Sequence, residues 1–209
     1  MPRVTTAFKE DRRAEILEAA RRCVARSGFH QASMQDICAE AGMSPGNLYR
    51  YFPSKEAIIA AIAERDRAEV GAELGAAQFT DNFFATFEAL ARHHLVERSA
   101  DDVGLCTEMV AESRRNPAIA RIMQDFDKDV RARLIAMLRA AAERGDIRSD
   151  VDFDGVVTML IVIADGVWWR RAVDPAFDAE AVLPIFMDLT RHMLLGGAVG
   201  ENKNKGAQS

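Results

Sequence analysis

The sequence lacks any hydrophobic run long enough to cross a bilayer. Its longest apolar stretch, residues 156–164, is interrupted by Thr158 and bounded by Asp154 and Asp165, whereas a membrane-spanning helix needs about 20 apolar residues. The first residues are polar and basic, without the apolar segment of a secretory signal peptide. We therefore expect a cytoplasmic protein with no membrane partner.

Cysteine and histidine are also scarce, with three and four residues in a chain of 209. Cys23, Cys38 and Cys106 show neither paired spacing nor zinc-ligand spacing, which favours a reducing compartment. Cys106 is either a redox-sensitive thiol or, as we expect, a buried inert one. The neighbours His93 and His94 would point about 100° apart on an α-helix, so the sequence predicts no metal site and no cofactor.

Strand-like alternation of apolar and polar residues is missing beyond residue 60, and apolar residues recur instead at helical spacing. We therefore predict an all-α fold, in which Pro184 kinks the last helix or delays its start. Half of the residues are apolar, which argues against disorder outside the polar tail at 196–209. The predicted helices are residues 11–27, two short segments within 33–52, 54 to 71 or 75, 81–98, a short segment around 105–110, 116–145, 152–173 and 178–195.

The segment Ser33–Lys55 predicts two short helices joined by a tight turn. Ser33 is a suitable N-cap for the first helix, and Gly42 stands where that helix must end and a left-handed backbone suits glycine. Ser44 is placed to cap the second helix, with Pro45 at its first position, where a missing N–H does no harm. This arrangement is typical of a helix-turn-helix, whose second helix enters the DNA major groove.

Several motifs follow one another in order: ILEAA at 16–20, Gly28-Phe29, ICAEAGMS at 37–44, GNLYRYF at 46–52 and SKE at 54–56. Together they resemble the DNA-binding domain of the tetracycline-repressor (TetR) family over residues 10–60. The resemblance implies a transcriptional repressor that holds double-stranded DNA as a homodimer. Cys38 departs from the alanine that the family usually has there, but it is small enough for the helices to pack.

Residues of the second short helix and its flanks are the expected contacts with DNA: Ser33, Ser44, Pro45, Gly46, Asn47, Tyr49, Arg50, Tyr51 and Lys55. Gly46 lets the backbone approach DNA closely, and Asn47 and Arg50 can bond base edges or phosphates. The resemblance implies that both tyrosines and the lysine of this set clamp phosphates. The competing interpretation is a helical hairpin with an incidental polar face.

Charge is divided unevenly along the chain. Residues 1–55 carry nine Lys or Arg against six Asp or Glu, a net of +3, so the total of −5 leaves −8 for the remainder. A basic N-terminal part on an acidic remainder suits a DNA-binding domain with a separate second domain, although ordinary variation in surface charge gives the same numbers.

The segment 152–173 is apolar around nearly its whole circumference. Such a helix needs burial on all sides, so we expect it to pair with residues 178–195 and with a second copy in a homodimer. A monomer with a central helix is the alternative. Aromatic and methionine residues of the middle helices, with Asp165, are candidates for lining a small-molecule pocket: Phe87, Met109, Met123, Phe126, Met159, Asp165, Trp168 and Trp169. Glu108 and Arg170 are alternative polar anchors, and core packing is the competing explanation for each apolar residue.

Residues 42–46 match the G-x-S-x-G motif of hydrolases, which requires a strand before the serine. A predicted helix precedes Ser44 instead, so no catalytic residue is predicted. We expect a DNA-binding domain at 1–54, a dimerisation and effector domain at 55–195, and a disordered tail at 196–209. The expected function is a dimeric repressor released from a palindromic operator by a small-molecule effector. The alternatives are an activator without an effector, or a helical binding protein or enzyme with an incidental helix-turn-helix.

Overall fold

The computed structural model describes residues 6–196, so residues 1–5 and the expected tail at 196–209, apart from Gly196, lie outside the described residues. Within 6–196 the chain forms helices and no strand, which confirms the all-α prediction. No helix in this range combines the length and apolar character needed to span a membrane. The elements are α1 (Thr6–Gln31), α2 (Met34–Glu40), α3 (Pro45–Tyr51), α4 (Lys55–Ala77), α5 (Phe83–Arg92), the π-helical turn η1 (His93–Glu97), α6 (Ala100–Ser113), α7 (Pro117–Arg144), α8 (Phe153–Val173) and α9 (Ala179–Leu195).

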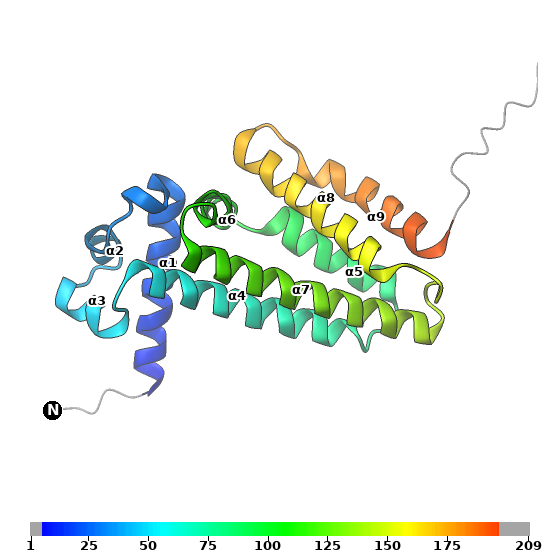
Figure 1. The fold of residues 1–209 in the computed structure, drawn as a ribbon, viewed down its shortest axis with the longest axis horizontal. Coiled ribbons are helices and arrows are strands. Elements are labelled where there is room, and N and C mark those ends of the chain that lie inside the picture. The colour runs from blue at the N-terminus through cyan, green and yellow to red at the C-terminus, as the bar shows by residue number, and fades with distance from the viewer. Residues whose placement is uncertain (1–5, 197–209) are drawn as a thin grey trace, which may run out of the picture.

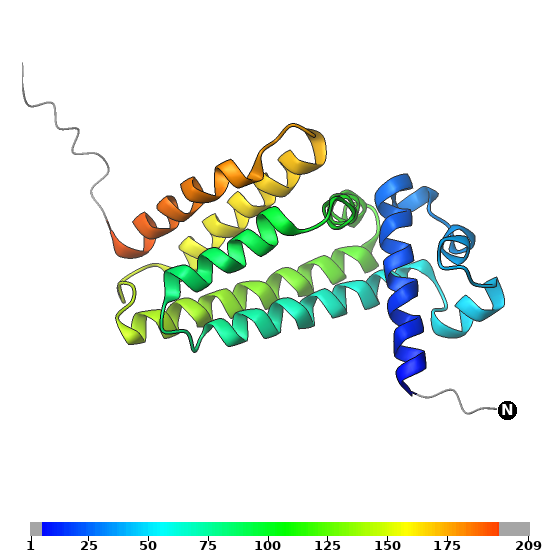
Figure 2. The ribbon, with the colours of Figure 1, turned by 180° about the vertical axis from the view of Figure 1, so that it is seen from behind.

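Helices α1–α3 form a head at one end of an elongated molecule, and α4–α9 form the body (Figure 1). Seen from both sides, α4 leaves the head and runs beside α7, while α8 and α9 lie together at the opposite edge of the body (Figure 2). The two ends of the described chain therefore lie at opposite ends of the molecule.

Two clusters of buried residues form the core. One lies in the body, between α4, α5, α7, α8 and α9. The other joins Ile16, Ile37 and Leu48 of the head to Ile58 of α4, and extends to Leu105, Met109 and Ile119 of α6 and α7. The head therefore completes its hydrophobic core with residues that lie beyond position 54 in the sequence.

Most predicted helix ends coincide with observed caps. Asn116 accepts hydrogen bonds from the first backbone N–H groups of α7, and Gly145 ends this helix with a left-handed φ of 84°. Gly28 interrupts α1 at φ 79°, as its position predicted, although one further helical turn follows it. Of the two effects expected of Pro184, a delayed start is excluded, because Asp178 caps α9 through Ala181 N–H and Pro184 lies inside the helix. The kink stays a prediction.

The helix after residue 81 ends differently from the expectation. Its last turn, η1, is π-helical and therefore wider than an α-helical turn. The rings of His93 and His94 lie 5.0 Å apart between centroids, because the wider turn brings the two side chains together. The two side chains therefore lie closer together than the predicted separation of about 100° implied, and the expected absence of a metal site stays a prediction.

Gly145→Ala is expected to lower the free energy of unfolding by about 1 kcal/mol, because a side chain at positive φ is strained even where space is open. Gly75→Ala is the matched control: this glycine lies inside α4, a methyl group added there would meet open space, and the substitution gains helix propensity of about 0.5–1 kcal/mol. Urea unfolding of both variants checks the opposite signs. Equal effects of the two substitutions would contradict the assignment of Gly145 as a left-handed cap.

Candidate nucleic-acid interface

Helix α3 is held by two buried apolar side chains that leave its other faces in solvent. Leu48 is fully buried and Phe52, directly after the helix, is 2% exposed. Between them, Tyr49 is 54% exposed, and Asn47 and Arg50 are also exposed. The alternation follows from helical spacing, since positions 48 and 52 share the face toward α1 and α2. The exposed face therefore carries amide, phenol and guanidinium groups on a rigidly anchored helix.

The turn before α3 has the geometry that the sequence predicted. Ser33 forms a capping box with Asp36, and Gly42 has a left-handed φ of 62°. Cys38 is 3% exposed and packs in the head core, as expected for a small residue at this crossing. Ser44 occupies the N-cap position of α3, but its side chain makes no capping hydrogen bond, which corrects that part of the prediction.

Seven of the nine predicted DNA contacts are exposed: Ser33, Ser44, Pro45, Gly46, Asn47, Tyr49 and Arg50. Tyr51 is half-buried against the head core. The Lys55 ammonium donates to the backbone carbonyls of Phe29 and Ala32, the latter at 2.7 Å, and lies 4.1 Å from the Phe29 ring centroid. Burial lowers the pKa of Lys55. Lys55 thus ties α4 to the end of α1, and its contact with a phosphate stays a prediction.

Helix α6 contacts the head where α1 ends. The Glu108 carboxylate accepts a hydrogen bond from the Phe29 backbone N–H at 3.1 Å. Glu112, only 3% exposed, lies 2.7 Å from His30 Nε2. These carboxylates lie four residues apart on one face of α6 and hold the segment just before the helix-turn-helix.

An ion cluster, which we name the joint cluster, links α1, α4 and α6 through Arg21, Asp66 and Asp102. Arg21 is 5% exposed and its guanidinium bonds both carboxylates, Asp102 at 2.6 Å. Burial alone would raise the pKa of Asp102, but hydrogen bonds from Ser99 and the charges of Arg98 and Arg21 hold it below its ordinary value. Sequence reasoning missed this cluster, because its members lie 36 to 81 positions apart and no local pattern marks them.

A polar cleft of about 230 Å³ opens beside the joint cluster. It is lined by charged residues of α1, α4 and α6, including Arg65 and Asp101. A second, more open cleft of about 390 Å³ lies where α8 begins, against Met193 of α9.

The eight residues predicted to line one effector pocket are not brought together. Phe87 stacks on Phe186 in the body core, with ring centroids 6.1 Å apart. Met109 and Met123 belong to the head core instead. Phe126 is half-buried on α7, Met159, Asp165 and Trp169 are exposed on α8, and Trp168 donates its indole N–H to the His94 carbonyl at 3.0 Å. Helical spacing identified apolar faces but not which core each face joins.

The candidate anchors and Cys106 have separate positions. Glu108 contacts the head, whereas Arg170 pairs with Asp174 at 3.1 Å on α8. Cys106 is half-buried, and this burial raises the pKa of its thiol to about 11. The thiol is therefore protonated at neutral pH, which makes it a poor nucleophile.

Comparison with known proteins gives matches over both parts of the chain. The family model described as "Bacterial regulatory proteins, tetR family" matches residues 16–62, and "BetI-type transcriptional repressor, C-terminal" matches residues 85–195. The HTH-type transcriptional regulator UidR of Escherichia coli (strain K12) is 31% identical over 74% of this chain and 79% of UidR. The HTH-type transcriptional repressor AcnR of Corynebacterium diphtheriae is 30% identical over 82% of this chain and 87% of AcnR. The solved structure of Salmonella enterica GusR matches with a TM-score of 0.77 and 28% identity, over 92% of this chain and 99% of GusR.

Asp102→Asn is expected to lower the free energy of unfolding by about 2–3 kcal/mol at pH 7, because it leaves the buried Arg21 with one carboxylate fewer. The folded-state pKa of Asp102 is lowered, so its contribution is present above the unfolded value near 4 and is lost as the pH falls through the folded value. The free energies of unfolding of wild type and variant should therefore be closer at pH 3 than at pH 7, and urea unfolding at both pH values measures this difference.

Asp101→Asn is the matched control, since it removes the same charge from the neighbouring exposed position of α6. Its expected effect is below about 0.5 kcal/mol. Equal losses in the two variants, or a loss for Asp102→Asn that persists unchanged at pH 3, would contradict the role given to the joint cluster.

Proposed function

The chain belongs to the tetR family of bacterial regulatory proteins, and we propose that it is a homodimeric repressor that holds a palindromic operator through two copies of α3. The observation that carries the proposal is the exposed polar face of α3 on its buried anchors Leu48 and Phe52. The relatives that are similar over most of this chain are transcriptional regulators. An enzyme or carrier with an incidental helix-turn-helix is therefore not favoured. We propose no catalytic activity.

Helix α3 would read DNA from its exposed face. Asn47 offers a donor and an acceptor that match the major-groove edge of adenine, and Arg50 carries a fork that fits guanine or a phosphate. A Cβ added at Gly46 would meet nothing within 4 Å, which supports close approach of this backbone to DNA. Tyr49 and Ser44 supply hydroxyl groups toward phosphates at the edges of the contact.

The proposed dimer interface lies on α8 and α9. Positions 159, 162, 166, 169 and 173 recur at three- and four-residue spacing on α8, and the apolar ones among them are about half exposed or more. Two neighbouring apolar residues of α9, Ile185 and Leu189, are 61% and 49% exposed. An apolar face of this extent favours burial against a second copy, and twofold pairing would make a four-helix bundle.

Effector control would act through the helices shared by head and body. Helix α4 begins directly after α3 and extends through the body, and α6 holds the end of α1 through Glu108 and Glu112. An effector that binds the body and favours another arrangement of α4 and α6 would change the separation of the two heads. The effector changes the affinity for DNA only to the extent that it binds the two arrangements with different affinity. The charged cleft beside the joint cluster, where α4 and α6 of the body meet α1 of the head, is one candidate position.

Asn47→Ala and Arg50→Ala test the proposed docking on fragments that the wild-type chain selects from genomic DNA. Each is expected to weaken the specific complex by roughly 10- to 100-fold, the value of one good base contact. Fluorescence anisotropy at several salt concentrations measures the affinities. Arg50→Ala is also expected to reduce the salt slope by about one ion if it bonds a phosphate.

Arg139→Ala is the control for charge, because this arginine is exposed on α7 in the body. It is expected to bind DNA as the wild-type chain does. Unaltered binding by both α3 variants, or an equal loss in Arg139→Ala, would refute docking through α3.

Val162→Glu tests the proposed dimer interface, since it places a carboxylate on the exposed apolar face of α8, where Val162 is 57% exposed. The expected result is at least a roughly tenfold weaker dimer in sedimentation equilibrium, because the charge must be desolvated at the interface. Phe79→Glu is the control: Phe79 is 88% exposed but lies between α4 and α5. A wild-type chain that stays monomeric, or a Val162→Glu variant that dimerises like wild type, would overturn this interface.

A further inference from the structure

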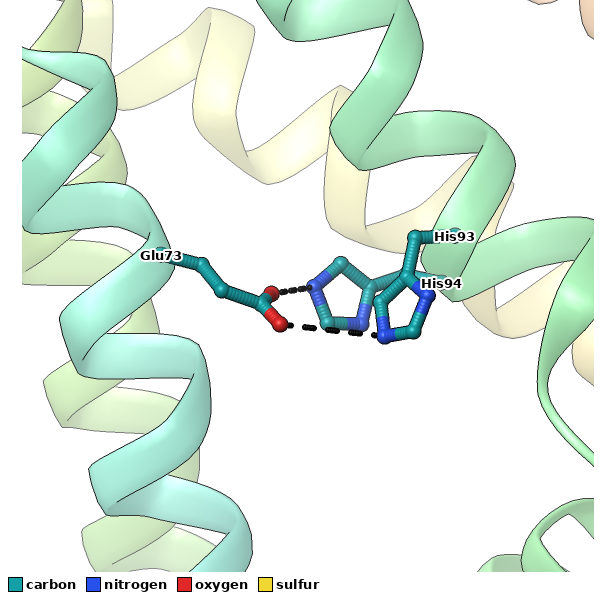
Figure 3. Close-up of side chains that lie close together, drawn as sticks. All are labelled: Glu73, His93 and His94. Atoms are coloured by element: carbon teal, nitrogen blue, oxygen red, sulfur yellow. Dashed lines mark hydrogen bonds and ion pairs between the residues drawn. The ribbon is translucent and has the colours of Figure 1, made fainter.

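Three side chains with metal-ligand chemistry converge between α4 and η1, as Figure 3 shows. Glu73 of α4 faces His93 and His94, and the three candidate ligand atoms lie within 4.8 Å of one another. His94 Nε2 is 2.8 Å from one Glu73 oxygen, and His93 Nε2 is 3.7 Å from the other. The three residues are all half-buried. Neither the helix-turn-helix nor the apolar face of α8 uses this cluster.

The distances suit a small divalent ion. Zn²⁺ binds imidazole nitrogen and carboxylate oxygen at roughly 2.0–2.2 Å, so two ligand atoms of a tetrahedral site lie about 3.3 Å apart. The His94 and His93 nitrogens lie 2.8 and 3.7 Å from the two different oxygens of Glu73, on either side of that value, and the three candidate ligand atoms lie within 4.8 Å of one another. Small rotations of the side chains would therefore complete the geometry without movement of the helices.

His93 is oriented as a metal ligand commonly is. Its Nδ1 lies 3.4 Å from a Glu97 oxygen, one turn further along η1. A proton on Nδ1 would donate to this carboxylate and leave the lone pair of Nε2 facing Glu73. A carboxylate behind the histidine fixes the ring and raises its basicity as a ligand.

The Nε2 atom of His93 is buried and has no hydrogen-bond partner among the described residues. If the Nδ1–H group of His93 donates to Glu97, the lone pair on Nε2 faces a carboxylate oxygen of Glu73. Two acceptors repel each other unless a cation lies between them. A metal ion or a second proton on His93 removes this conflict. The pKa of His94 is lowered, chiefly because the ring is buried. This favours the neutral imidazole, the form that binds a metal.

The backbone around the cluster is fixed from α8. Trp168 donates to the His94 carbonyl, and the Arg171 guanidinium donates to the carbonyls of Leu95 at 3.1 Å and of Arg98. These bonds occupy carbonyl groups at the end of η1 and hold the π-helical turn that brings the two rings together. The cluster is therefore part of a braced structure and not a chance meeting of surface side chains.

We propose that Glu73, His93 and His94 form a binding site for one divalent transition-metal ion of the Zn²⁺ type. Two imidazoles and one carboxylate are ligands that such ions accept, and three protein ligands leave a fourth position for water or an anionic group. The carboxylates of Glu73 and Glu97 supply negative charge at the site. The nearby cation Arg98, which acts on His94, is faced by Asp102 at 3.5 Å and Glu69 at 3.9 Å. The bound ion joins α4 to η1 at the point where Glu73 already pairs with His94.

The test uses the full chain without a polyhistidine tag, titrated with Zn²⁺ by calorimetry and with Co²⁺ by absorption spectroscopy. The expected result is one ion per chain, with visible Co²⁺ bands typical of four-coordinate nitrogen and oxygen ligands. Zn²⁺ at ten times the dissociation constant is expected to raise the Tm by roughly 3–5 °C. The affinity falls as the pH drops, because the imidazoles must be neutral to bind the ion.

Variants separate this site from other metal-binding groups. Loss of a residue that hydrogen-bonds a metal ligand typically lowers metal affinity roughly 10- to 100-fold, so Glu97→Gln is expected to lower Zn²⁺ affinity by about tenfold. Glu73→Gln and His93→Gln remove ligands themselves, and each is expected to lower Zn²⁺ affinity by more than roughly 100-fold. His30→Gln is the matched control, because His30 also pairs with a glutamate, Glu112, but lies in the last turn of α1, in the head. This control is expected to keep the wild-type affinity and the Zn²⁺-dependent rise in Tm.

Four outcomes would overturn the proposal. They are no binding by the wild-type chain, unaltered affinity in Glu73→Gln and His93→Gln, sulfur-to-cobalt charge-transfer bands, and half an ion per chain with association of chains. Circular dichroism confirms that each variant is folded, and His93, 39% exposed, is the substitution least disruptive to packing. DNA binding is not a readout here, so failure of this proposal and failure of the proposed function remain distinguishable.

Discussion

The structure depends on a buried guanidinium whose two close carboxylate partners lie on two other helices. Arg21 of α1 is withdrawn from water and needs Asp66 of α4 and Asp102 of α6 at the same time. A buried guanidinium that loses a partner carries a large desolvation cost, so the three helices are held in one relative position. Because α1 belongs to the head and the other two to the body, this requirement sets the place of the head on the body.

The head and the body are consequently not independent units in energetic terms. The head completes its core with Leu105 and Met109 of α6 and Ile119 of α7, and Lys55 of α4 binds the carbonyls at the end of α1. A displacement of α4 or α6 must therefore move the helix-turn-helix or break these contacts. The same two helices pass the charged cleft, and α4 also carries Glu73 toward the histidines of η1. Changes in the position of α4 or α6 are thus transmitted directly to the helix-turn-helix.

Helix α8 illustrates how one sequence pattern serves two environments. Val157 and Leu160 are buried in the body, while Val162 and Trp169 are exposed on the other side of the helix. A helix that is apolar all round needs a second apolar surface in addition to its own core. Helix α9, which packs beside α8, also carries exposed apolar residues, and this pair of helices is where we propose the twofold contact.

The sequence by itself determined the all-α fold, most helix ends and the exposed face of α3. These features follow from local chemistry: Ser33, Gly42, Asn116 and Gly145 act on the backbone of their own turns, and helical spacing places Leu48 inward and Tyr49 outward. Only the tertiary structure decided which distant side chains meet. It assigned Met109 to the head core and Phe87 to the body core, joined Arg21 to two remote carboxylates, and bound Lys55 to the end of α1. It also replaced the last α-helical turn before Arg98 by a π-helical one, so that His93 and His94 meet Glu73, because contacts from α8 rather than local propensity hold that turn.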